Sequence, residues 1–218
     1  GKFMGEYSPT DNTVGINYEK IRDIAGHYGV DAHLLFLDVL IHEENHAVSK
    51  TQCWNLLDEQ GEPSLVTSGY YSVAYEREKS GKISLIGKTY ELFNEGITEW
   101  RAREMLREYL RRTGYGDANK AERLRRYLDT HHPYNRAIQV AKALTRRLAA
   151  ANGVEEDAAR DAIMRGYFEG ENLLHENFKE WFSEILSPDF MERLMMADDE
   201  DLTILLDELE HAPLKKAA

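Results

Sequence analysis

Two histidines four positions apart, with a glutamate directly after the first, are the residues best suited to chemistry in this sequence. His42, Glu43 and His46 lie in the stretch VLIHEENHAV, residues 39–48. Side chains four positions apart share one face of a helix, so both imidazoles can reach one metal ion. The glutamate points to the neighbouring side of that ion, where it can take a proton from a metal-bound water. The pattern therefore predicts a metal site that activates water.

The segment around these residues is apolar on nearly every side. From Leu34 to Ile41 only Asp38 is polar, which is typical of a helix buried over most of its surface. We expect this helix to span residues 31–50, with Asp31 as its cap. Polar side chains in such surroundings cost free energy unless something compensates them, and a divalent cation would do so. A histidine pair with a purely structural role is the alternative.

A catalytic zinc ion needs a third protein ligand and an open position for water. The stretch FNEGITEW, residues 93–100, supplies two carboxylates one helical turn apart, Glu95 and Glu99, on a face that continues with Ala102 and Leu106. Carboxylates on an inward face are costly unless a positive group meets them. We expect Glu95 to bind the metal and Glu99 to accept the second ring N–H of His42 or His46. Two histidines and one glutamate favour Zn²⁺.

Taken together, these motifs resemble those of the gluzincin class of zinc metallopeptidases. The matching residues are His42-Glu43-x-x-His46 and Asn94-Glu95-Gly96-x-Thr98-Glu99. The opening GEYSPTDNTVGI, residues 5–16, is similar to a Gly-x-Tyr-x-Pro…Asn-Thr strand that often precedes the active-site helix in small bacterial peptidases of this kind. The resemblance covers about residues 5–110, roughly half of the chain.

The resemblance implies zinc-dependent hydrolysis of peptide bonds, most simply by an endopeptidase. Glu43 would be the general base, and Glu95, within Asn-Glu-Gly, would be the third metal ligand. One departure from the family pattern is the separation of the motifs, because 48 residues lie between His46 and Glu95. An inserted hairpin at residues 66–85 can account for it. Glu91 and Glu99 compete with Glu95 for the ligand role.

The class resemblance also implies a Tyr or His from a downstream helix that donates a hydrogen bond to the developing oxyanion. The stretch THHPYN offers His131, His132 and Tyr134. We choose Tyr134, because it shares an apolar stripe with Ala137 and its ring should face the core or the cleft. An ordinary core tyrosine is the alternative.

The rest of the chain predicts an α+β fold that is predominantly helical, with a small antiparallel hairpin in the N-terminal half. We expect one domain of residues 1–218, with a zinc-binding half at 1–115 and a helical half at 116–218 that closes the cleft. The expected strands are at 14–16 and in a hairpin at 71–85. Helices are expected at 18–28, 31–50, 93–114, 118–128, from Pro133 onward, 155–167, 171–186 and in an acidic tail.

A net charge of −12 on 218 residues argues against a nucleic-acid binder that acts by general electrostatics. The basic stretch from Arg101 to Arg126 is interleaved with acids such as Glu104 and Glu122, so we expect solvated helix faces there. No run approaches the ~18 apolar residues of a membrane span. The expected partner is a peptide or protein substrate.

The single cysteine, Cys53, excludes an internal disulfide and a cysteine metal cluster, and it suits a reducing compartment. We therefore expect the cytoplasm. A mature secreted fragment is the alternative, because the sequence starts at Gly1.

Two other functions compete with peptide hydrolysis by an unspecialised peptidase. One is a catalytically silent relative that serves as a regulatory or interaction protein, which would be expected to lack Glu43 or a histidine. The other is a regulatory peptidase that cleaves a repressor, with the basic helices between Arg101 and Arg126 docking it to DNA or to that repressor.

Overall fold

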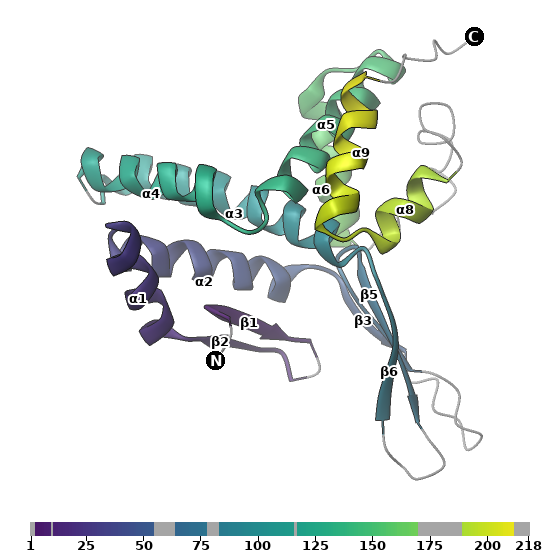
Figure 1. Ribbon diagram of the computed structural model, residues 1–218, viewed down its shortest axis with the longest axis horizontal. Coiled ribbons are helices and arrows are strands. Elements are labelled where there is room, and N and C mark those ends of the chain that lie inside the picture. Colours follow the sequence, from purple (N-terminus) through teal and green to yellow (C-terminus); the bar gives the residue numbers. More distant parts are fainter. Residues whose placement is uncertain are drawn as a thin grey trace. The chain divides into compact units, whose positions relative to one another are not determined.

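The computed structural model describes residues 3–9, 11–54, 64–77, 83–115, 117–169 and 189–211 (Figure 1). In these ranges the protein is an α+β fold dominated by helices, which confirms the predicted class. The strands are β1 (Gly5–Ser8), β2 (Thr13–Ile16), β3 (Thr51–Trp54), β4 (Ser64–Ser68), β5 (Tyr71–Arg77) and β6 (Ile83–Thr89). The helices are α1 (Tyr18–Tyr28), α2 (Ala32–Val48), α3 (Glu91–Thr113), α4 (Ala118–His131), α5 (Asn135–Asn152), α6 (Glu156–Glu169), α8 (Phe190–Met196) and α9 (Asp199–His211). The helix expected at 171–186 lies outside the described residues.

The chain divides into two compact units that are interleaved in sequence. One consists of Gly1–Val48 and Thr98–Asn135, and the other of Ser49–Ile97 and Arg136–Ala218. Helix α3 is continuous and contributes its first turns to the second unit and its remainder to the first. From the sequence we expected two consecutive halves, 1–115 and 116–218, and the cleft-closing role of residues 116–218 stays a prediction.

In the first unit, local capping explains where α1 and α2 begin and end. The Asn17 side chain accepts a hydrogen bond from the backbone N–H of Lys20 at the start of α1, and Gly29 ends the helix in the left-handed region at φ 66°. The Asp31 carboxylate accepts hydrogen bonds from the backbone N–H groups of His33 and Leu34 and so caps α2 as expected. These boundaries agree closely with the predicted ones.

The β1–β2 ribbon and α1 pack against α2, which occupies the middle of this unit (Figure 1). The sequence predicted only the second strand, because β1 reads as a run of turn residues. A hydrophobic cluster joins α1 and α2 to α3 and α4; its fully or nearly buried members include Ile21, Leu35, Leu106, Leu124 and Leu128. This core packs α2 against α1, α4 and the C-terminal part of α3.

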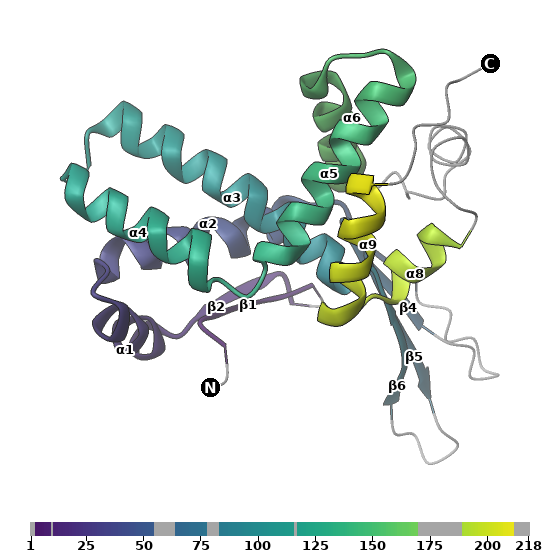
Figure 2. The same cartoon turned by 45° about the horizontal axis from the view of Figure 1, so that its top comes forward.

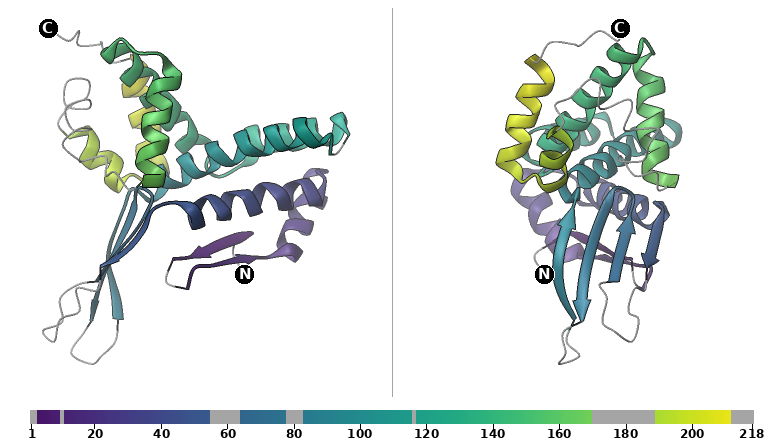
Figure 3. Two further views of the ribbon diagram at one scale, coloured as in Figure 1. Left: turned by 180° about the vertical axis from the view of Figure 1, so that it is seen from behind. Right: turned by 90° about the vertical axis from the view of Figure 1, so that its right-hand side faces the viewer.

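The second unit contains an antiparallel sheet of order β3-β4-β5-β6, seen in the right-hand view of Figure 3. The predicted hairpin corresponds to β5 and β6, whereas β3 and β4 were not predicted. The β4–β5 turn needs Gly69 at φ 59°, where an added Cβ would also collide with Asn94 and Tyr167. The Asn94 side chain accepts hydrogen bonds from the backbone N–H groups of Tyr70 and Tyr71, which ties this turn to α3.

Helices α5, α6 and α9 gather beside one another in the same unit (Figure 2). The Arg147 side chain of α5 donates a hydrogen bond to the carbonyl of Leu209 near the end of α9, and the Tyr70 hydroxyl donates to the carbonyl of Ile163 in α6. Two expected boundaries were wrong. Helix α4 continues to His131, and α5 begins at Asn135, so Pro133 lies in the preceding turn and not in the first turn of the helix.

None of the described helices is both long enough and apolar enough to cross a lipid bilayer.

Candidate metal centre

Helix α2 places the two motif histidines side by side in its buried C-terminal half. His42 and His46 are 7 % and 8 % exposed, and their Nε2 atoms are 3.2 Å apart. Two nitrogens bound to one tetrahedral zinc ion at about 2.0–2.1 Å would stand roughly 3.3 Å apart. The rings therefore converge as two ligands of a single ion would.

Helix α3 supplies the third group. Because α3 runs unbroken from Glu91 to Thr113, Glu95 precedes Glu99 by one turn on the same face. His42, His46 and Glu95 each offer a ligand atom, and these atoms all lie within 4.8 Å of one another. The three side chains could thus hold one metal ion. The competing ligand Glu91 is exposed and pairs with Lys88 at 2.8 Å.

Glu99 is fully buried and supports His42, as the sequence predicted for one of the two histidines. Its Oε2 lies 3.0 Å from His42 Nδ1, and its Oε1 accepts a hydrogen bond of 2.6 Å from Arg103 Nε. When Nδ1 of His42 donates to this carboxylate, Nε2 keeps its lone pair for a metal ion. Burial would raise the pKa of Glu99, but the charges of His132, His42 and Arg103, together with the hydrogen bond from His42, lower that pKa to about 2.

A second buried group consists of Asp38, Glu99 and His132, whose ligand atoms also lie within 4.8 Å of one another. Both oxygens of Glu99 already have donors, and the Arg103 guanidinium places a positive charge at this point. A second cation there would be repelled by that charge, so we interpret the group as an anchor for His42. Asp38 was not predicted to take part in the site, although its position one turn before His42 in an otherwise apolar run indicated it.

Asp38 is 1 % exposed, and its Oδ1 has no hydrogen-bond partner among the described residues. Burial and the nearby charge of Glu99 raise the pKa of Asp38 well above its ordinary value. The pKa values of these two neighbouring acids are therefore shifted in opposite directions, downward for Glu99 and upward for Asp38.

Glu43 lies on the side of α2 that faces β1. A Cβ built on Gly5 would be 2.6 Å from Glu43 Oε1 and 2.8 Å from Val39, so only glycine allows this approach. Strand β1 thus places a glycine directly beside Glu43.

Tyr134 lies beside His42, but not where the sequence placed it. It belongs to the turn between α4 and α5, and not to the apolar stripe of α5. Its ring stacks on that of His42 with centroids 5.7 Å apart and planes inclined by 15°. The described structure therefore brings this candidate oxyanion donor next to a candidate metal ligand.

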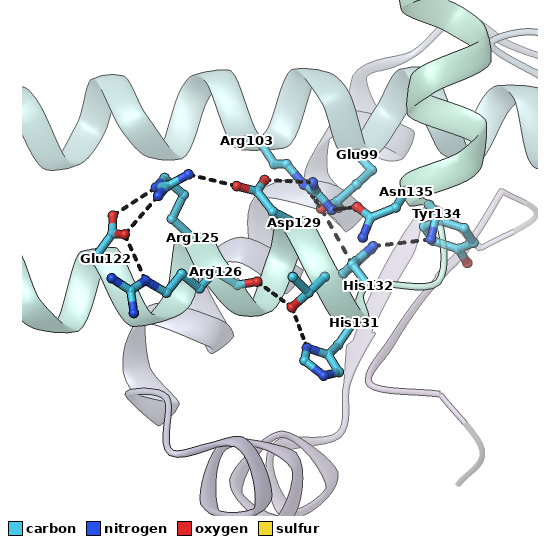
Figure 4. A network of polar contacts seen from close by, with 11 residues as sticks. Glu99, Arg103, Glu122, Arg125, Arg126, Asp129, His131, His132, Tyr134 and Asn135 are labelled. Carbon is cyan, nitrogen blue, oxygen red and sulfur yellow. Dashed lines mark hydrogen bonds and ion pairs between the residues drawn. The ribbon is translucent and has the colours of Figure 1, made fainter.

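The two other candidate donors have different surroundings (Figure 4). His132 is buried, with Nδ1 accepting from the backbone N–H of Tyr134 and Nε2 lying 3.6 Å from Glu99 Oε1. His131 is exposed and contacts the rings of Tyr28 and Tyr127. These contacts leave Tyr134 as the best placed of the three.

Two further residues of the second motif serve the fold. Asn94 holds the β4–β5 turn through its side-chain oxygen. A Cβ added to Gly96 would be 2.7 Å from the backbone of Ala137, so this glycine permits α3 and α5 to pack closely. The motif thus has structural residues on both sides of Glu95.

The basic residues of α3 and α4 are largely paired along their own helices. Arg111 and Arg112 pair with Glu108, and Arg125 and Arg126 pair with Glu122. This pairing is what solvated helix faces would show.

Comparison of the chain with protein-family models, with curated proteins and with solved structures gives no match.

Proposed function

We propose that this protein is a zinc-dependent peptidase that hydrolyses internal peptide bonds. The observation that carries the proposal is that ligand atoms of His42, His46 and Glu95 lie within 4.8 Å of one another, while the buried Glu99 carboxylate contacts His42. Glu43 follows the first of these ligands in sequence, as a base for the metal-bound water must.

The donor set fits zinc in the chemistry of its atoms. Two neutral imidazoles and one carboxylate bring a single negative charge to a divalent ion, so the centre would remain positive toward an oxyanion. When bound, zinc supplies a Lewis acid that polarises the scissile carbonyl and brings the pKa of a coordinated water near ≈ 7.

The protein's own residues perform the remaining steps. The Glu43 carboxylate takes the proton of the attacking water and afterwards delivers it to the leaving amine. The Tyr134 hydroxyl donates a hydrogen bond to the oxyanion of the tetrahedral intermediate. The stacking of the Tyr134 ring on the ring of His42 supports this role. Glu99 keeps the imidazole of His42 in one orientation throughout.

The direct test is the substitution Glu43→Gln, followed by digestion of a peptide library with and without a chelator. General-base catalysis is worth about 10²–10⁴-fold, so the rate should fall by at least that factor. Elemental analysis should still find one equivalent of zinc, because Glu43 is not a ligand. The neighbouring exposed residue Glu44 provides a matched control, and Glu44→Gln should keep full activity.

Unchanged hydrolysis by Glu43→Gln would reject the mechanism. If the wild-type protein binds zinc but cleaves no peptide in the library, the catalytically silent relative becomes the better description.

A further inference from the structure

We propose that Arg103 and Asn135 are positioning residues that hold Tyr134 against His42 through the Glu99 network, defined as Glu99, Arg103, His132 and Asn135. This inference rests on the proposed function, because it assigns Tyr134 to the reaction. It adds two residues that neither motif contains.

Arg103 stands at the centre of the network (Figure 4). It follows Glu99 by one turn on α3, is 8 % exposed, and donates from Nε to Glu99 Oε1 at 2.6 Å. Its Nη2 donates to Asn135 Oδ1 at 2.9 Å, and its Nη1 lies 3.8 Å from Asp129. A planar guanidinium fixes the relative directions of these bonds, so it joins α3 to the last turn of α4 and the first residue of α5.

The turn that carries Tyr134 is closed by its own hydrogen bonds. The backbone N–H of Asn135 donates to the carbonyl of His132, and the backbone N–H of Tyr134 donates to His132 Nδ1. Pro133 restricts the backbone between them. Because the turn is short and closed, the hydrogen bond from Arg103 to Asn135 also sets the direction of the Tyr134 ring.

Glu99 connects this turn to the metal ligand. One carboxylate oxygen receives His42, and the other faces Arg103 and His132. The network therefore has two arms, one leading to His42 and one leading through Asn135 to Tyr134. Arg103 belongs to both arms, whereas Asn135 belongs only to the second.

This difference gives separate expectations for the two residues. Loss of Arg103 should weaken zinc binding as well as turnover, since the support of a ligating histidine is typically worth about 10–100-fold in metal affinity. Loss of the Asn135 side chain should leave zinc affinity unchanged and lower kcat by about 10- to 100-fold through misplacement of Tyr134, with little change in KM.

The experiment is a double-mutant cycle with Asn135→Ala and Tyr134→Phe, measured as kcat, KM and zinc affinity of the full chain. In the Tyr134→Phe background, Asn135→Ala should change kcat by less than about twofold, because the group it positions is gone. Asn135→Asp keeps the acceptor for Arg103 and should restore most of the lost activity. A full Asn135→Ala effect that persists without the Tyr134 hydroxyl would overturn the proposal.

Arg103→Met and Arg103→Lys test the other arm by competition with a zinc chelator, a measurement that requires no hydrolysis. Both should bind zinc more weakly, and Lys should recover only part of the affinity, because it cannot bridge Glu99 and Asn135 together. The control Arg107→Met removes an exposed arginine one turn further along α3 and should leave zinc affinity unchanged.

Wild-type zinc affinity in both Arg103 variants would overturn the proposed role of Arg103, even if the protein hydrolyses peptides. A wild-type protein that binds zinc without hydrolysing peptides would instead refute the proposed function. The chelator competition would then still test whether Arg103 supports zinc binding through Glu99.

Discussion

At the scale of single residues, the candidate centre contains two buried acids, Glu99 and Asp38, whose surroundings shift their pKa values in opposite directions. Glu99 accepts hydrogen bonds from His42 and Arg103, which stabilise its charge. Asp38 lies one turn before His42 on α2. Burial and the charge of Glu99 raise the pKa of its carboxyl. Its charge is therefore disfavoured where the charge of Glu99 is favoured.

This difference predicts the effect of pH on Asp38→Asn in the zinc-free protein. The folded-state pKa of Asp38 is raised above its value of 3.8 in the unfolded chain, so the stability contributed by its protonated form is present below pH 3.8 and is lost as pH rises through the folded-state pKa. Asparagine stays neutral throughout. The variant should therefore gain stability over the wild type progressively as pH rises above 3.8, measured as the free energy of unfolding in urea.

Asp31 provides a control of opposite sign. The hydrogen bond from Lys120, the largest influence, lowers the pKa of Asp31, so its contribution is present above pH 3.8 and is lost at lower pH. Asp31→Asn should lose stability relative to the wild type as pH rises. A flat difference between Asp38→Asn and the wild type would show that the Asp38 carboxyl is not held neutral.

The same scale shows what the sequence could reveal about the centre. Helical spacing places His42 and His46 on one face of α2, and Glu95 and Glu99 on one face of α3. The meeting of these two faces could be anticipated from the cost of carboxylates on an inward face and from the resemblance to metallopeptidase motifs. Arg103 and Asn135 could not, since they meet only after α3, α4 and α5 are assembled. Tyr134 lies near His42 through a turn and not through the helical stripe that suggested it.

At the scale of elements, glycines determine how closely the site-bearing segments approach each other. Because Gly5 has no side chain, β1 can lie close to α2, and because Gly96 has none, α5 can pack close to α3. Neither position requires a positive φ, so close contact and not backbone conformation is the reason for glycine at both.

Gly96→Ala should therefore destabilise the protein by about 1–3 kcal/mol, the usual effect of forcing a methyl group into a packed interface. The matched control is Gly26→Ala in α1, where a Cβ meets nothing within 4 Å. That change should stabilise the helix by about 0.5–1 kcal/mol. Thermal and urea unfolding of both variants measures the contrast, and equal effects of the two substitutions would contradict the packing argument.

The elements themselves were unevenly predictable. Helix α1 was predicted with its observed boundaries, because its apolar residues recur at helical spacing and Gly29 marks its end; the structure adds the cap formed by Asn17. Strands β3 and β4 were missed because Thr51–Trp54 is short and acquires its structure by pairing with Leu65–Ser68. Pairing of this kind depends on partners distant in sequence, which no local pattern reveals.

At the scale of the whole molecule, a metal ion would link helices that are far apart in sequence. The proposed ligands come from α2 and α3, so the unfolded chain would not hold them together. Zinc should then stabilise the folded protein by mass action, by about 2.7 kcal/mol at a free concentration one hundred times its Kd.

Differential scanning calorimetry with zinc and with a chelator measures this stabilisation. Glu95→Ala should reduce it strongly, whereas Glu91→Ala should not, because Glu91 pairs with Lys88 on the surface. The reverse result would move the third ligand from Glu95 to Glu91. Magnesium, which prefers six oxygen ligands, should give no comparable shift.

The polar stripe of α2 has an evolutionary consequence. Asp38 Oδ1 and Asn45 Nδ2 are both buried without hydrogen-bond partners among the described residues, on either side of His42. Apolar side chains of similar size at these positions would increase the free energy of unfolding. If the proposed zinc chemistry were lost in a descendant of this protein, both residues could be replaced by leucine or methionine, and such replacements would indicate that loss.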